Sequence, residues 1–192
     1  MARLIVLLLL AGCGGAQVAP ARPAQHEDAI VWDFEQAVKQ GREPYLALFD
    51  LAAVGKFEKL LHRYDVLGRS DLPPEWKAAY EAEDATPFTV ERERTNVGNF
   101  YPLLGTRTVG TGGCERVAPV SEYARLLGQA FEPLPAGLEH YDALRQDVNQ
   151  MIARGGLVAM KCRGGKGRLA LVWTASDSPR GYDLITMYDD VD

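Results

Sequence analysis

The stretch GGLVAMKCRGGKGRLALVWTASDSPRGYDLITMY, residues 155–188, carries the clearest structural pattern in the chain. It contains three runs rich in apolar and β-branched residues, at Leu157–Cys162, Leu169–Thr174 and Tyr182–Tyr188. The turn-forming sequences RGGKG and SDSPRG separate these runs. Short β-rich runs joined by such turns pair with their sequence neighbours in antiparallel fashion. We therefore expect a C-terminal three-stranded antiparallel meander.

Helical patterns dominate the chain ahead of this meander. Their apolar residues recur at intervals of three and four, which is the spacing of one helix face. The segments with this spacing are Glu27–Gln40, a stretch from Pro44 to Ala52, Lys56–Tyr64, Glu75–Glu83, Val120–Phe131 and Leu138–Arg154. In contrast, Phe88–Asn96 alternates in charge and is predicted to be a strand, and the glycine-containing Phe100–Cys114 is predicted to be a loop.

The order of these elements indicates an α+β fold. Helices come first and the meander last, without the regular strand–helix alternation of a parallel sheet. A chain of 192 residues, 47% hydrophobic and 24% charged, has the composition of a globular protein. We expect a single globular domain over residues 27–192. The net charge of −5 provides no general field that attracts nucleic acid, so no nucleic-acid partner is expected.

The first twelve residues have the pattern of an export signal. Met1–Leu10 combines a positive end, formed by the amino terminus and Arg3, with an apolar run that starts at Leu4. This run is far shorter than the ~20 residues that a helix needs to cross a bilayer. We therefore expect residues 1–12 to be a signal peptide.

The signal ends at Leu10-Ala11-Gly12-Cys13, which resembles the lipobox of bacterial lipoproteins. The resemblance implies that Cys13 receives a diacylglycerol, that the signal is cut before Cys13, and that the new amino terminus is acylated. Two or more fatty chains give durable membrane attachment. Because Gly14 rather than aspartate follows the cysteine, the resemblance also points to the outer membrane, facing the periplasm. The alternative is an ordinary signal cleaved after Ala16.

The segment behind Cys13 and the other two cysteines fit this interpretation. Residues 13–26 are small, proline-containing and without apolar periodicity, which indicates a flexible tether. With Cys13 assigned to lipid, Cys114 and Cys162 remain, in an oxidising compartment. They form either a disulfide or two separate half-buried thiols. They lack CxxC spacing and have no histidine nearby in sequence, so a metal site is not expected.

The stretch FEQAVKQGREPYLALFDLA, residues 34–52, resembles the opening helix pair of the NTF2-like family. In that family a helix, a short glycine turn and a second apolar helix precede a curved sheet. The resemblance implies that the helices pack into the concave sheet. It also implies that the pocket between them binds a ligand or houses a small enzyme.

The acid–base candidates are three histidines, His26, His62 and His140. His26 is expected to be solvated at the end of the tether. His62 lies near a predicted helix end, where a cation interacts favourably with the helix dipole. His140 has a carboxylate one and two positions away, but such neighbours do not face each other on a helix. None of the three is predicted to be catalytic.

Other motifs also have ordinary explanations. The serines Ser121, Ser176 and Ser178 lack a G-x-S-x-G elbow, and GTGGC lacks the spacing of a phosphate-binding loop, so no cofactor is expected. The acidic tail Asp189, Asp190 and Asp192 lacks the EF-hand pattern. The most basic spot is the turn that carries Lys161, Arg163, Lys166 and Arg168. It is either a solubilising edge or a contact for anionic head groups or cell-wall polymer.

These observations lead to a membrane-anchored envelope lipoprotein. Our first hypothesis is a non-catalytic domain that binds an unknown protein or small-molecule partner. One alternative is a small envelope enzyme whose acid–base residues, His62 or His140, converge in an NTF2-like pocket. Another is a structural component of the envelope. A pocket lined by apolar groups would favour binding, and a histidine or carboxylate pair in a cleft would favour catalysis.

Overall fold

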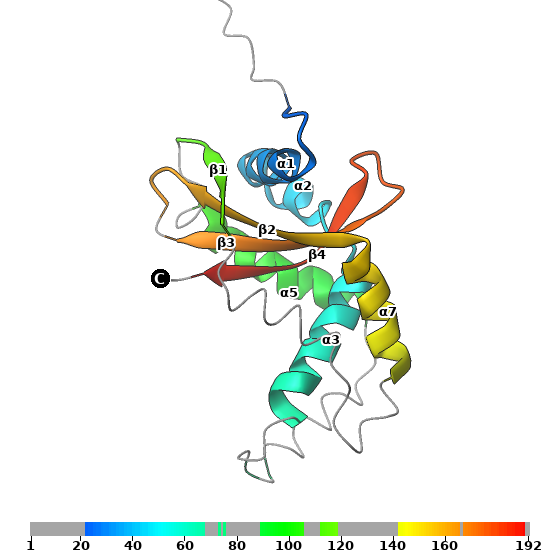
Figure 1. The fold of residues 1–192 in the computed structure, drawn as a ribbon. Coiled ribbons are helices and arrows are strands. Elements are labelled where there is room, and N and C mark those ends of the chain that lie inside the picture. The colour runs from blue at the N-terminus through cyan, green and yellow to red at the C-terminus, as the bar shows by residue number, and fades with distance from the viewer. Residues whose placement is uncertain are drawn as a thin grey trace, which may run out of the picture.

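The computed structural model describes residues 22–67, 73, 75, 89–105, 112–118, 142–165 and 167–190. In these ranges the chain combines helices with an antiparallel sheet, as expected for an α+β protein (Figure 1). Apart from Glu75, the expected helices Glu75–Glu83 and Val120–Phe131 lie outside the described residues.

The C-terminal meander is present as three consecutive antiparallel strands. They are β2 (Gly155–Cys162), β3 (Arg168–Ala175) and β4 (Tyr182–Asp190), and each pairs with the next along the chain. The turns between them contain Gly164 at φ +81° and Gly181 at φ +82°. Glycine adopts this left-handed backbone at no steric cost, which explains its place in both turns.

The sheet has a fourth strand, β1 (Cys114–Val117), so the expected number of three strands is one too few. β1 pairs with β2 at one edge of the sheet, in the order β1-β2-β3-β4. Glu115 and Arg116 occupy its middle, and both are exposed. Four residues with a charged middle lack the apolar alternation that marks a strand, so the local sequence carried no signal for it.

The N-terminal helix agrees with its prediction, and the one after it does not. α1 (His26–Gln40) covers the predicted segment, and α2 (Arg42–Leu46) follows it after Gly41 at φ +132°. The helix expected from Pro44 to Ala52 is wrong, because α2 ends within it and α3 (Leu51–Leu67) starts anew.

Asp50 and β4 together account for this break. The Asp50 carboxylate accepts hydrogen bonds from the backbone N–H groups of Ala52 and Ala53, at 3.0 and 3.1 Å, and so begins α3. Just before it, the Leu184 N–H donates to the Leu48 carbonyl at 2.8 Å, and the Asp50 N–H donates to the Leu184 carbonyl at 3.0 Å. Residues 48–50 therefore lie along the edge of β4 as extended chain.

The prediction of a strand at Phe88–Asn96 is wrong where the structure describes it, because α5 (Val90–Leu103) is a helix. Thr89 caps it, its side chain accepting from the Arg92 N–H at 3.2 Å. The alternating charges are mostly exposed, and the buried residues Glu93 and Val97 are four apart. The same helix also overturns the start of the loop expected from Phe100.

Helices cover both faces of the sheet. α1 and α2 lie on one face, and α3 and α7 (Asp142–Ala153) lie on the other (Figure 1). The core on the α1 side includes Ile30, Phe34, Met160 and Leu171. The core on the other side includes Phe57, Val148, Val172 and Ile185. α5 packs beside α2 and α3, close to the β4 edge.

Candidate functional site

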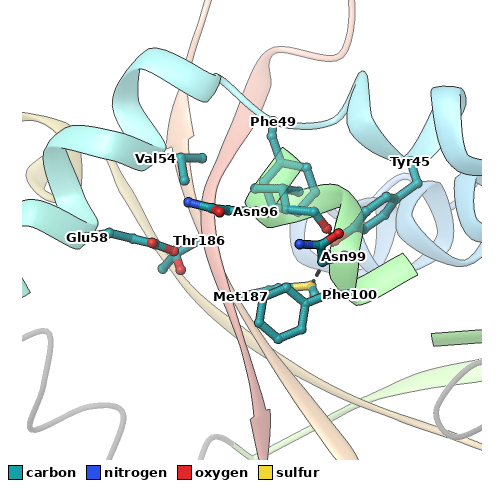
Figure 2. Close-up of a pocket in the computed structure, with 10 residues that line it drawn as sticks. Tyr45, Phe49, Val54, Glu58, Asn96, Asn99, Phe100, Thr186 and Met187 are labelled. Carbon is teal, nitrogen blue, oxygen red and sulfur yellow. Dashed lines mark hydrogen bonds between the residues drawn. The ribbon is translucent and has the colours of Figure 1, made fainter. Parts of the chain in front are cut away.

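A pocket of about 420 Å³ lies between α5, α3 and the edge of β4 (Figure 2). We call it the α5–β4 pocket. The described residues that line it are Tyr45, Phe49, Val54, Glu58, Asn96, Val97, Asn99, Phe100, Thr186 and Met187. Its volume is in the range of small-molecule sites, which are mostly apolar with a few placed polar groups.

One part of the pocket is aromatic. The Tyr45 residue is fully buried, and its ring meets that of Phe49 edge-on with centroids 5.2 Å apart. Its hydroxyl donates to the Val97 carbonyl at 3.2 Å and lies 3.5 Å from the Met187 sulfur. Burial raises the pKa of Tyr45, so the phenol stays neutral. Phe100 is 46% exposed and leaves part of its ring open to solvent.

The polar part of the pocket comes from three elements. Glu58 follows Val54 by four positions on α3, which places both on one helix face. Asn96 and Asn99 come from α5, and Thr186 comes from β4 (Figure 2). The pocket therefore combines hydrogen-bonding groups with aromatic rings.

The electrostatics of the pocket depend on Glu58. The Glu58 residue is exposed, but its carboxyl is partly desolvated by the surrounding protein, which raises its pKa, and the negative charge of Glu93 raises that pKa further. Glu93 is 6% exposed and accepts from the Asn96 amide at 3.2 Å. Among the described residues, no hydrogen bond or ion pair to Glu58 is present.

α5 is fastened on the face opposite the pocket. Arg94 pairs with Glu43 of α2, and the Tyr101 hydroxyl donates to the Val38 carbonyl at 3.2 Å. At Gly98 the helix comes so close to Arg42 that a Cβ would lie 2.1 Å from its guanidinium. These contacts recur at helical spacing and turn Asn96, Asn99 and Phe100 toward β4.

A second polar cluster joins the start of α1 to β4. We call Arg22, His26, Asp33 and Tyr182 the Asp33 cluster. The Arg22 guanidinium donates hydrogen bonds of 2.9, 3.2 and 2.7 Å to the Asp33 carboxylate. The buried Tyr182 hydroxyl donates to the same carboxylate at 2.9 Å. Burial and then Asp33 raise the pKa of Tyr182. The His26 ring lies 4.6 Å from that of Trp173, so His26 is exposed but packed against the domain.

Cys114 and Cys162 are joined by a disulfide. They face each other in the register of β1 and β2, so the bond ties the edge strand to the meander. The Cys114 N–H donates to the Glu35 carboxylate of α1 at 3.0 Å, and Lys39 pairs with the same carboxylate. The bridge therefore also connects the sheet edge to α1.

The other candidate residues of the sequence form no site in the part of the chain that the structure describes. Cys13 and His140 lie outside the described residues, and His62 lies on α3, with its side chain not described. Ser176 and Ser178 hydrogen-bond to each other in the β3–β4 turn at 2.9 Å. In the described part of the chain, no group of three His, Cys, Asp or Glu side chains could hold a metal ion. No helix among the described residues is long and apolar enough to cross a membrane.

Comparison with known proteins adds no assignment. No family model matches the chain, and no curated protein or solved structure shows significant similarity to it. The lipobox and NTF2-like resemblances therefore stay predictions.

Sequence reasoning missed the α5–β4 pocket. The strand assigned to Phe88–Asn96 concealed the helical spacing of Asn96, Asn99 and Phe100. Glu58 gave one usable signal, because it is a carboxylate at helical spacing from the apolar residues Leu51, Val54 and Leu61. The contribution of β4 depends on tertiary structure and has no local signal.

Proposed function

We propose that this protein is a lipid-anchored binding protein of the bacterial envelope. A lipid on Cys13 would hold the domain at the membrane. The expected location is the outer membrane, with the domain facing the periplasm. The α5–β4 pocket would take a small amphipathic ligand. The observation that carries the binding role is the pocket itself, whose lining combines aromatic rings with hydrogen-bonding side chains.

The composition of the pocket favours binding over catalysis. An enzyme of the kind considered above needs a histidine or a pair of carboxylates directed at the substrate. The described lining contains one carboxylate, Glu58, and no histidine. Glu93 interacts with Glu58 electrostatically but is engaged by Asn96 and is not among the described lining residues.

The lipid anchor is tested by metabolic labelling. Palmitate label should appear on the full chain and disappear in the Cys13→Ser variant, because the modification requires the thiol. Label that persists in this variant would overturn the anchor.

The pocket is tested by NMR of methyl-labelled methionine in the full-length Cys13→Ser chain, with benzyl alcohol as a neutral probe. Met187 lines the pocket, whereas Met160 is fully buried in the core and serves as an internal control. A saturable change in the chemical shift of the Met187 methyl group, with no change at Met160, supports the site. A probe of this size should bind with a Kd of the order of millimolar. No saturable change at Met187 would overturn the pocket as a binding site.

A further inference from the structure

We infer that the ligand of the α5–β4 pocket is an organic cation, an ammonium group attached to an apolar or aromatic body. This inference rests on the proposed binding function and specifies the ligand class. It follows from the placement of one carboxylate and three aromatic rings around the same space.

One carboxylate borders the pocket. Glu58 lines the pocket, and no described residue neutralises it by a hydrogen bond or an ion pair. Although the residue is exposed, partial desolvation of its carboxyl and the negative charge of Glu93 raise its pKa, so its ionised form is less favourable than that of a free side chain. A perturbed carboxyl in a pocket is typical of a functional site. A bound cation would offset the repulsion from Glu93.

Tyr45, Phe49 and Phe100 line the space that Glu58 borders (Figure 2). Tyr45 is fully buried and packs edge-on against Phe49, whereas Phe100 is the exposed ring of the three. The face of an aromatic ring attracts a cation through its quadrupole. Phe100 is 46% exposed although it lies on a packed helix, so one ring remains accessible to an entering ligand. The Met187 thioether adds a polarizable contact for the apolar body.

The described lining of the pocket is negatively charged, because Glu58 is its one charged side chain. No lysine or arginine is among the described residues that line the pocket. α5 carries two arginines, Arg92 and Arg94, and neither is among the described lining residues; Arg94 pairs with Glu43 of α2. An anionic ligand would therefore meet Glu58 and, close by, Glu93, without a compensating cation in the described lining. The Asn96 and Asn99 amides can bind polar substituents of a ligand of either charge, so they do not reverse this preference.

Three probes of similar shape and different charge test the inference. Benzyltrimethylammonium, benzyl alcohol and phenylacetate are titrated separately into the full-length Cys13→Ser chain, and the Met187 methyl signal is followed. The ammonium probe should bind about five- to tenfold more tightly than the alcohol. Phenylacetate should bind more weakly than the alcohol.

Two variants with the same change in net charge locate the effect. Glu58→Gln should abolish the advantage of the ammonium probe, so that the ammonium and alcohol probes bind this variant with similar affinity, because the carboxylate charge is removed while the side chain keeps its shape. Glu91→Gln removes an exposed carboxylate of α5 outside the pocket and should change neither affinity.

The outcomes separate the inference from the proposed function. Equal binding of alcohol and ammonium, or an ammonium advantage that survives Glu58→Gln, overturns the cation inference and leaves the pocket as a binding site. An equal loss of ammonium binding in both variants shows a general effect of net charge and also overturns it. Absence of binding by all three probes overturns the pocket and the inference together.

Discussion

Reducing the Cys114–Cys162 disulfide should cost this domain a large part of its stability. The two residues are 48 positions apart, and cross-linking removes the corresponding loop-closure entropy from the unfolded chain. In the chain-entropy model a loop of this length contributes about 4 kcal/mol. For a domain of this size, about 2–4 °C per kcal/mol predicts that Tm falls by about 8–16 °C on reduction.

The measurement is guanidinium unfolding of the full-length Cys13→Ser chain, which leaves these two cysteines alone, with and without a phosphine reductant. Trp32 and Trp173 provide fluorescence signals in the described domain. Reduction should lower the free energy of unfolding and raise the m-value, because the released unfolded chain exposes more surface. Reduction opens the bond without replacing a side chain. This is preferable to mutation, because Cys162 is 1% exposed and its replacement by Ala would also leave a cavity in the core.

The Cys114→Ala/Cys162→Ala double variant is the companion experiment and should lose somewhat more stability than the reduced chain. A loss below about 1 kcal/mol on reduction would refute the entropic reasoning, since it would mean that the unfolded chain gains little freedom when the bond opens.

Three further predictions concern single side chains. Gly155→Ala should destabilise the domain by about 2–3 kcal/mol in chemical denaturation, because a Cβ there would lie 1.7 Å from a backbone carbonyl of β3. The control Gly156→Ala should cost less than about 1 kcal/mol, because the nearest atom to its Cβ, in the Trp173 side chain, would be 3.4 Å away. Glu58→Gln should raise Tm at neutral pH, and because a raised carboxyl pKa destabilises the fold only when the group is ionised, the gain should disappear by about pH 3; a gain independent of pH would contradict the assignment. Asp33→Ala leaves the buried Tyr182 hydroxyl without its acceptor and should lower the free energy of unfolding by about 1–3 kcal/mol. Tyr182→Phe removes the donor itself and should cost less stability. Denaturant titration compares the two variants, and an equal or reversed order would argue against a buried unsatisfied group.

The parts of the fold that could be predicted have local causes. β2, β3 and β4 alternate or run apolar between glycine turns, and α1 carries an apolar stripe of helical period. β1 could not be predicted, because its four residues gain their strand conformation from pairing with β2 and from the bond at Cys114. The break between α2 and α3 likewise depends on a distant contact, the pairing of residues 48–50 with Leu184.

α5 shows a different kind of failure. Alternating charges over residues 91–94 fit a strand of period two, but all except Glu93 lie outside the core, so they constrain the backbone little. The cap at Thr89 and the four-residue spacing of Glu93 and Val97 are the stronger physical signals. The pocket inherits this error, since half of its polar groups come from the misassigned helix. Its other wall requires the β4 edge to be near α3, which only the tertiary structure shows.

The Asp33 cluster also sets how far the domain could reach. Arg22 is held to Asp33, so with a lipid at Cys13 only residues 13–21 separate the anchor from this fixed point. At ~3.4 Å per residue a fully extended tether of this length would span about 30 Å. That is comparable with the diameter of a domain whose radius of gyration is about 15 Å. If Cys13 carries the proposed lipid, the domain would stay within this distance of the membrane surface. It would then meet molecules that diffuse along or close to that membrane at a high effective concentration.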